Sequence, residues 1–192
     1  MSGTSAKVEL RRRFRAARRA LDPVARAAAA AATCTTIEAF IARLRPPALA
    51  SYAAAGGELD LDHLHQHRWQ RGEVVWLPRV RGDDLTWHPL TSARSLIVGA
   101  FGIREPSAEV PAASLPSGTL VLVPGVAFAT NGHRLGQGRG YYDRALAGQP
   151  VFGIGIGFAC QRCDFLPIES HDRRLDGLIL DGEWLRSPTL AP

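Results

Sequence analysis

The sequence is poor in cysteine and lysine, and it has no long apolar run. Its three cysteines, Cys34, Cys160 and Cys163, are too few for a disulfide framework and suit a reducing compartment. No stretch approaches the roughly 18 consecutive apolar residues of a membrane-spanning helix. The first residues also lack the apolar segment of a signal peptide. We therefore expect a cytoplasmic protein without a membrane partner.

The positive charge is concentrated near the N-terminus. The net charge is +5, but residues 1–26 carry Lys7 and seven arginines against two acidic side chains, so the rest of the chain is close to neutral. Such a helix could be a solvated surface, or it could bind the backbone phosphates of a nucleic acid. Neither an aromatic stacking platform nor a known nucleic-acid motif accompanies it, so a nucleic-acid-binding module is the less favoured hypothesis.

Strand-like and helix-like segments alternate along the 192 residues. Asp22 and Pro23 have the form of a helix cap and a first helical residue. The pattern predicts a single domain over residues 1–192, a three-layer Rossmann-like α/β fold with a mostly parallel sheet and helices on both faces. An N-terminal helical arm over about residues 5–45 should pack on it. We expect helices at 5–21, 23–45, 59–71 and 140–147, and strands at 49–54, 73–80, 85–90, 119–123, 151–157 and 177–180.

Prolines and glycines make parts of this pattern more specific. Pro78 should break the strand at 73–80, residues 85–90 should form an edge strand, and residues 92–118 should be mostly irregular. Gly153, Gly155 and Gly157 alternate along an apolar strand. This alternation predicts a central strand that a neighbouring group approaches closely.

The strongest chemical signal lies in residues 122–146. An apolar run leads into a loop with five glycines and two arginines, which ends at Tyr141-Tyr142-Asp143 and a helix. Glycines let backbone N–H groups turn inward, and the start of a helix adds partial positive charge, so we predict an anion site. The loop has neither the G-x-G-x-x-G spacing of a dinucleotide fingerprint nor the Gly-Lys-Ser/Thr of a Walker A loop.

Arg134 and Arg139 favour phosphate as the anion, because a guanidinium group binds phosphate through two parallel hydrogen bonds. Asp143 would repel a polyphosphate unless a cation lay between them. Magnesium bridges carboxylate and phosphate oxygens in this way. The residues therefore predict a metal-bound nucleotide polyphosphate.

The whole stretch resembles the signature of the 5-formyltetrahydrofolate cyclo-ligases, also called methenyltetrahydrofolate synthetases. The shared pattern is P-G-V-A-F-x-x-x-G-x-R-L-G-x-G-x-G-Y-Y-D-R over residues 124–144. Further blocks match at residues 7–11 (K-x-x-L-R), 58 (Glu), 77–80 (L-P-R-V), 101–106 (F-G-I-x-E-P) and 166–176 (L-P-x-x-x-x-D-x-x-L-D). The family more often has aspartate, arginine and glycine where this chain has Ala129, Gln137 and Arg139.

The resemblance implies an activity. It is the ATP-dependent cyclisation of 5-formyltetrahydrofolate to 5,10-methenyltetrahydrofolate, with release of ADP and phosphate through a phosphorylated formyl (iminium-phosphate) intermediate. The implied cofactor is Mg²⁺, and the implied partners are two small molecules, ATP and the folate, with no nucleic acid. We also expect a monomer. Another ATP-dependent phosphotransfer enzyme on the same fold stays open as an alternative, as does the nucleic-acid-binding module.

The resemblance also implies roles for individual residues. The implied catalytic residues are Arg134, Arg139, Tyr141 and Tyr142, and the implied magnesium ligands are Asp143 and Asp172. The implied ATP-binding residues are Lys7, Arg11, Arg134, Leu135, Gly136, Gln137, Gly138, Arg139, Gly140, Tyr141 and Tyr142. The implied folate-binding residues are Ala53, Glu58, Phe101, Gln137, Gly138, Arg139, Gly140 and Tyr141. Among them, Glu58 would accept hydrogen bonds from a pterin, and Phe101 would stack on its ring.

Overall fold

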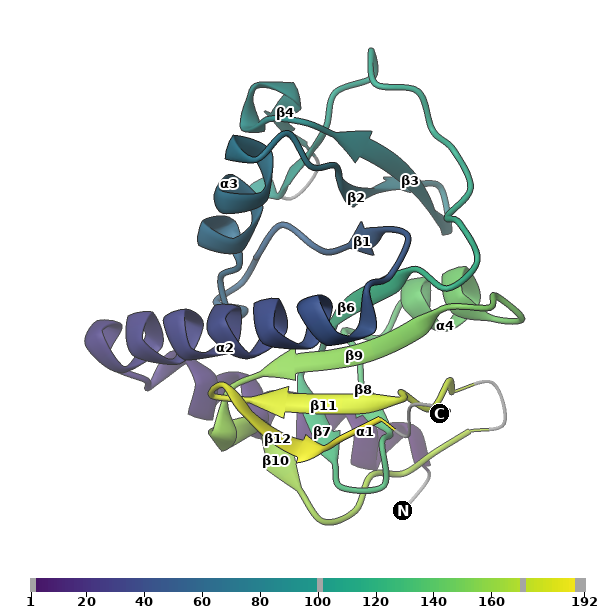
Figure 1. The fold of residues 1–192 in the computed structure, drawn as a ribbon. Helices are drawn as coiled ribbons and strands as arrows, with labels where there is room; N and C mark the ends of the chain where they lie inside the picture. The colour runs from purple at the N-terminus through teal and green to yellow at the C-terminus, as the bar shows by residue number, and fades with distance from the viewer. Residues whose placement is uncertain (1–2, 100–101, 170–171, 189–192) are drawn as a thin grey trace.

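A seven-stranded sheet forms the centre of the molecule in the computed structural model, which describes residues 3–99, 102–169 and 172–188 (Figure 1). The strand order is β12-β11-β9-β6-β1-β2-β3. The inner strands run parallel, whereas the two edge strands are antiparallel to their neighbours. In sheet order the strands are β12 (Glu183–Arg186), β11 (Gly177–Leu180), β9 (Phe152–Gly157), β6 (Leu120–Pro124), β1 (Leu49–Ala50), β2 (Val75–Arg81) and β3 (Asp84–Leu90). This confirms the α/β class and the mostly parallel sheet.

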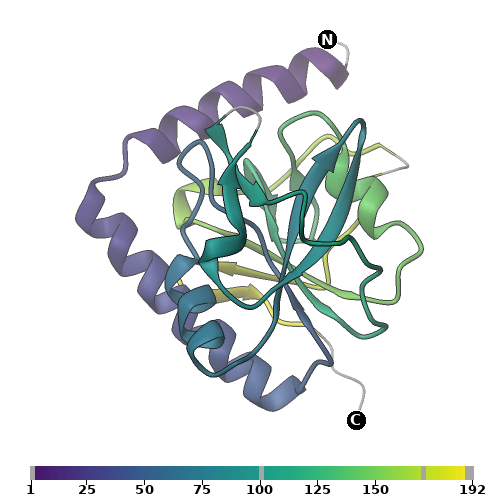
Figure 2. The same cartoon turned by 90° about the horizontal axis from the view of Figure 1, so that it is seen from above.

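Helices cover the sheet on both sides, as predicted. One side packs against α2 (Pro23–Leu44) and α3 (Asp62–Gln70), which bury Ile37, Phe40 and Leu64 in the larger core cluster. The other side packs against α4 (Tyr141–Leu146), which buries Leu146 in a second cluster. The first helix, α1 (Gly3–Arg19), meets α2 at an angle, and the pair runs along the outside of the sheet (Figure 2).

The junction between α1 and α2 follows the predicted capping chemistry. The two carboxylate oxygens of Asp22 accept hydrogen bonds from the backbone N–H groups of Val24 (2.9 Å) and Ala25 (3.3 Å). Pro23 occupies the first turn, where a helix needs no donor from it. The chain therefore turns between the two helices at residues 20–22 and sets α1 apart from the rest of the arm.

The alternating glycines of β9 lie where an aromatic ring presses on the sheet. A Cβ atom on Gly155 would lie 2.8 Å from the Phe128 ring and 2.6 Å from a methyl group of Leu178. A Cβ atom on Gly157 would lie 2.6 Å from the same ring. Phe128 is completely buried, so the ring cannot move aside. The predicted close approach is thus confirmed, and the neighbour is a side chain from the 122–146 stretch.

Two small sheets extend the fold, and the sequence pattern did not predict them. The first contains β10 (Arg162–Cys163), β7 (Ala127–Ala129) and β8 (Arg134–Leu135), and the second contains β4 (Leu96–Val98) and β5 (Arg104–Pro106). Two short 3₁₀ helices, η1 (Ala93–Ser95) and η3 (Ala159–Gln161), complete the described elements. The described part of residues 92–118 is otherwise mostly irregular, as expected, but it contains the β4–β5 hairpin, which was not predicted.

Two predicted strands differ from the observed ones. The strand β1 has only two residues, so the expected strand at 49–54 is mostly an extended loop. Pro78 does not break β2, and it pairs with Trp87 of β3, which forms the predicted edge strand. Because β1 pairs with β2 only up to Trp76, the β1 side of β2 needs no hydrogen-bond donor at residue 78.

The composition of α2 bears on the expected absence of a membrane-spanning helix. Among the described residues, this helix is long and apolar enough, by length and composition, to cross a membrane, with a mean hydropathy of 1.3 over its most apolar window. A third of that window is buried inside the molecule. The signal is weak, because a helix of a protein core passes the same test, and α2 packs on α3, β11 and β12.

Candidate functional site

Two of the predicted binding segments lie beyond the carboxyl ends of β1 and β6. The chain leaves β1 toward β2 on one side, and β6 lies on the other side of β1, so the strand order reverses at this point. In open α/β sheets, ligands bind in the crevice at such a reversal. The Glu58 loop follows β1, and the glycine-rich segment follows β6. Both predicted binding segments therefore lie at this strand-order reversal, the usual position of a ligand crevice in such sheets.

The glycine-rich loop has backbone angles that only glycine adopts freely. Gly138 has φ +108° and Gly140, which precedes α4, has φ +67°. The following helix has six residues, so its dipole is small. A Cβ atom on Gly138 would lie 3.4 Å from the Arg11 guanidinium carbon, because α1 crosses directly over the loop.

A row of cations on α1 holds the loop and its surroundings. Lys7 Nζ lies 3.0 Å from Asp172 Oδ2 and 3.3 Å from Glu169 Oε2. One turn on, Arg11 Nε donates to the Gly136 carbonyl at 2.9 Å. One turn further, Arg15 Nη2 and Nε donate to Gln137 Oε1 at 2.6 and 3.1 Å. Lys7, Arg11 and Arg15 therefore have partners within the molecule, whereas Arg12, Arg13 and Arg19 of the same helix are exposed.

A further cation, Arg134, follows the strand β7 and pairs with α4. Arg134 Nη2 donates to Asp143 Oδ1 at 2.9 Å, with the two side chains 5% and 15% exposed. The guanidinium carbon of Arg134 also lies 5.5 Å from the centre of the Tyr142 ring. Burial raises the pKa of the Tyr142 hydroxyl far above its ordinary value, and the negative charge of Glu58 adds to this rise. The Tyr142 hydroxyl therefore stays protonated beside Arg134.

Glu58 reaches the same place from the other loop. One oxygen of its carboxylate accepts the backbone N–H of Ala55 at 3.1 Å. Burial raises the pKa of the Glu58 carboxyl, whereas the Ala55 amide, the Arg18 charge and the Gln137 side chain lower it. Because Gln137 contacts both Arg15 and Glu58, it joins the predicted ATP side of the site to the predicted folate side.

The remaining predicted residues are less closely joined. Arg139 is exposed, and its side chain has no hydrogen bond or ion pair with the described residues, which leaves it free to bind a ligand. Leu135 is buried with Phe14 in a small core cluster, so only its backbone could meet a ligand. Tyr141 is half-buried beneath the Arg144 guanidinium, and Ala53 is half-buried after β1. Phe101 lies outside the described residues.

The two predicted magnesium ligands lie on neighbouring chain segments. Asp143 Oδ1 is 3.4 Å from the backbone nitrogen of Arg173, the residue after Asp172. In the part of the chain that the structure describes, no three histidine, cysteine or carboxylate side chains form a metal cluster. Magnesium carried by a nucleotide needs only one or two protein carboxylates, with phosphate and water oxygens as its other ligands. The oxygen donors of Asp143 and Asp172 fit such an ion.

Several site residues had a weak signal in the sequence. Arg15 and Arg18 continue the helical row of Lys7 and Arg11. Their hydrogen-bond partners lie far away in the sequence, so the row itself does not predict them. Arg173, whose guanidinium donates to the carbonyls of Leu146 (2.8 Å) and Val151 (3.3 Å), fixes the end of α4. Nothing in the local sequence could have indicated that contact.

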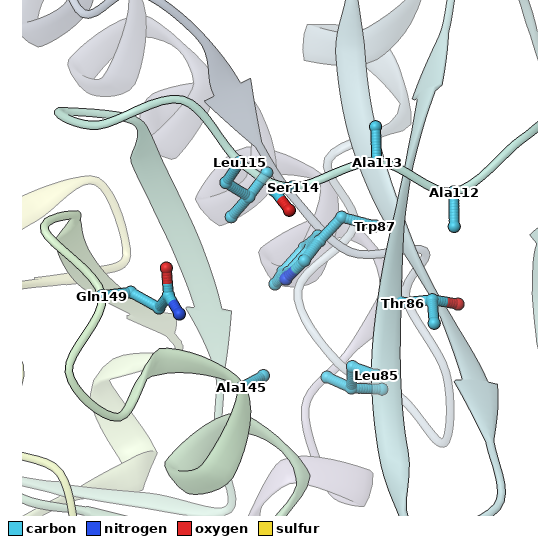
Figure 3. A pocket seen from close by; sticks show the side chains of 9 residues that line it. All are labelled: Leu85, Thr86, Trp87, Ala112, Ala113, Ser114, Leu115, Ala145 and Gln149. Carbon is cyan, nitrogen blue, oxygen red and sulfur yellow. The ribbon is translucent and has the colours of Figure 1, made fainter.

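A separate pocket of about 390 Å³ opens on the far side of Trp87 (Figure 3). Its lining comes from β3, from residues 112–115, and from Ala145 of α4 and Gln149 just after that helix. The Gln149 amide faces the Trp87 indole. None of the predicted site residues and no charged side chain lines it. A nucleotide triphosphate needs cations, so the crevice under α1 is the better candidate site.

Comparisons with known proteins identify the family of the chain. Residues 3–181 match the 5-formyltetrahydrofolate cyclo-ligase family. The chain belongs to this family. A 5-formyltetrahydrofolate cyclo-ligase from Escherichia coli K12 is 30% identical over 188 residues, covering 89% of this chain and 100% of that protein. The family resemblance seen in the sequence motifs is therefore confirmed.

Solved structures of the family show the same fold. The NMR structure of the Aquifex aeolicus 5,10-methenyltetrahydrofolate synthetase is 29% identical, with a TM-score of 0.82 over 97% of this chain and 96% of that one. A 5,10-methenyltetrahydrofolate synthetase from Mycoplasma pneumoniae, at 23% identity, shares the fold with a TM-score of 0.73 over 92% of this chain and 99% of that one.

Proposed function

We propose that this protein converts 5-formyltetrahydrofolate to 5,10-methenyltetrahydrofolate in a reaction that requires ATP and Mg²⁺ and releases ADP and phosphate. Membership of the cyclo-ligase family supports the overall reaction. The observation that carries the proposal is the meeting of two kinds of group in one crevice. The cations Lys7, Arg11 and Arg134 suit a triphosphate, and the Glu58 carboxylate suits the N–H donors of a pterin.

The chemistry explains why the site needs no nucleophilic side chain. A formamide carbonyl is a poor electrophile. Transfer of the γ-phosphoryl group breaks its bond to ADP and forms a bond to the formyl oxygen, while the N5 lone pair makes a carbon–nitrogen double bond. N10 then attacks the same carbon and loses its proton, and the carbon–oxygen bond breaks to release phosphate. Positioning and charge neutralisation are what such phosphoryl transfer requires.

The residues of the crevice can supply both. Lys7 and Arg11 now contact Asp172 and the Gly136 carbonyl, and the phosphates of ATP would compete for the same donors. Arg139 is free to reach the transferring group from the outer side of the loop. Tyr142 stays protonated and can donate its O–H to the formyl or phosphoryl oxygen. Asp143 and Asp172 would hold Mg²⁺, which neutralises phosphate charge.

One assay tests the proposal. The protein is mixed with 5-formyltetrahydrofolate, ATP and Mg²⁺, and the methenyl chromophore and ADP are measured together. We expect one ADP for each methenyl product and no product when ATP is omitted. ATP consumption without a methenyl product would contradict the proposal and favour a different phosphotransfer reaction. The monomeric state, the single-domain assignment and the cytoplasmic location stay predictions from the sequence.

Arg134→Met and Arg12→Met form a matched pair for this assay. Arg134 pairs with Asp143 of α4, whereas Arg12 pairs with Glu9 on the exposed side of α1 at 2.6 Å. We expect the first variant to lose at least about a hundredfold in kcat, as loss of one charge-stabilising donor does in other enzymes. The second should keep the wild-type rate.

A further inference from the structure

Arg18 occupies the point where the strand order reverses, and it contacts both loops of the crevice. Its Nη2 donates to the Gly56 carbonyl at 2.7 Å, and its Nη1 lies 3.4 Å from the Gly125 carbonyl. Gly56 belongs to the loop after β1, and Gly125 belongs to the segment after β6. A single guanidinium from α1 therefore joins the two loops that carry the proposed substrate residues.

Burial of the Arg18 guanidinium costs free energy unless a nearby negative charge compensates its positive charge. The residue is only 3% exposed, and its Nε is buried without a partner among the described residues. Burial lowers the pKa of the Arg18 guanidinium, and the nearby Glu58 charge opposes that shift. A buried cation is tolerated where a carboxylate compensates it. Glu58 is thus the acidic side chain whose charge acts on Arg18, and the Gly56 and Gly125 carbonyls are the direct hydrogen-bond acceptors of Arg18.

A second arginine provides a comparison within the same loop. Arg26 of α2 donates from Nη1 to the Gly57 carbonyl at 3.0 Å and also contacts the Arg18 carbonyl. Its charge does not act on Glu58 in the way that the Arg18 charge does. Arg26 thus holds the shape of the loop, whereas Arg18 both holds the loop and faces the carboxylate.

We propose that Arg18 is a positioning residue of the folate site, which fixes the 56–58 loop and thereby aims the Glu58 carboxylate at the pterin. This inference rests on the proposed function. Lys7, Arg11 and Arg18 lie on the same helix, so a ligand that moves α1 also moves the group that positions Glu58. The arrangement gives α1 a role on both the ATP side and the folate side of the crevice.

The ionisation of Glu58 provides a readout that a purely structural role would not change. The charged and titratable groups that face it are Arg18 from α1, Tyr52 after β1 and Tyr142 from α4. Of these, Arg18 supplies the positive charge, and both tyrosines remain neutral because burial raises the pKa of each. Removal of the Arg18 charge should therefore move the acid limb of folate binding to higher pH.

The test compares Arg18→Met with Arg26→Met. In the first variant we expect the KM for 5-formyltetrahydrofolate to rise about tenfold or more, which is the loss of one charge-assisted interaction, with the KM for ATP close to wild type. The acid limb of kcat/KM for the folate should also move to higher pH. Arg26→Met should leave that limb in place. A folded Arg18→Met protein with the wild-type limb, or the same displacement in Arg26→Met, would overturn the inference.

If Arg18→Met does not fold, a double-mutant cycle tests whether Arg18 acts on folate binding through Glu58. Arg18→Lys keeps the charge but cannot reach two carbonyls, and Glu58→Gln removes the carboxylate that Arg18 serves. We expect Arg18→Lys to raise the folate KM in the wild-type background and to have no effect in the Glu58→Gln background. Additive effects would refute the inference. If the wild-type protein itself makes no methenyl product, the proposed function fails instead, so the two failures are distinguishable.

Discussion

Replacement of Asp143 separates its predicted metal role from its structural role. In the structure Asp143 accepts a hydrogen bond from Arg134 at 2.9 Å, and both side chains are largely buried. Asp143→Ala would leave the Arg134 cation buried without its partner, which costs about 3–5 kcal/mol in comparable cases. Asp143→Asn keeps an oxygen that can accept from Arg134 and from the Arg173 N–H, so we expect a smaller loss of about 1–3 kcal/mol.

The two effects are measured on the same Asp143→Asn protein. Urea unfolding gives its stability, and the methenyl assay gives its turnover. If Asp143 holds Mg²⁺, the neutral amide is a much weaker ligand, and kcat should fall by at least about a hundredfold although the protein stays folded. Added Mg²⁺ should restore part of the rate.

Asp176→Asn is the matched control for this experiment. Asp176 is a half-buried carboxylate beside the sheet. It accepts a hydrogen bond from the backbone N–H of Gly153 at 2.8 Å, whereas Asp143 accepts one from a cationic side chain. Its asparagine variant should lose some stability and keep its turnover. A folded Asp143→Asn protein with near-wild-type turnover would refute the magnesium assignment.

Three further perturbations test other parts of the account. Gly155→Ala should lose about 1–3 kcal/mol of unfolding free energy in urea, because the new methyl group meets the fixed Phe128 ring. Burial lowers the pKa of His65 from 6.5 to about 4 where it bonds Ser51 at 2.8 Å. Below pH 6.5 the unfolded chain therefore binds a proton that the native state excludes, and about 3 kcal/mol of stability should be lost as the pH falls to 4, a loss that His65→Gln abolishes. Lys7→Met should raise the KM for ATP about tenfold and leave the folate KM unchanged in steady-state assays.

The sequence predicted elements whose signals are local. Asp22 and Pro23 marked the start of α2, and the apolar runs marked β6, β9 and β11. The short strands β7, β8 and β10 carry two or three residues each, too few for any hydrophobic period to appear. They form because their partners lie close in space.

Pro78 shows a related limit of sequence reasoning. Proline removes a hydrogen-bond donor, and the effect on a strand depends on whether that donor is needed. Here β1 is too short to require it, so β2 remains continuous. The length of a neighbouring strand cannot be inferred from the residues around Pro78.

In the candidate site, too, local features could be predicted from the sequence, whereas contacts between distant residues could not. Glycine spacing and the arginines of the loop are local features, and they predicted a phosphate site and the residues that form it. The contacts of Arg15 and Arg18 join residues that are 122 and 38 positions apart, and they depend on the angle at which α1 crosses the loop. Packing sets that angle, so the coupling between Arg18 and Glu58 became visible only in the fold.

The fate of the formyl oxygen tests the central claim most directly. The substrate is prepared with ¹⁸O in its formyl group and converted with unlabelled ATP and Mg²⁺, and the released phosphate is analysed by mass spectrometry. The proposed reaction predicts one ¹⁸O atom in the phosphate for each methenyl product, because the formyl oxygen leaves bonded to phosphorus. Recovery of the label in water, with unlabelled phosphate, would contradict phosphorylation of the formyl group.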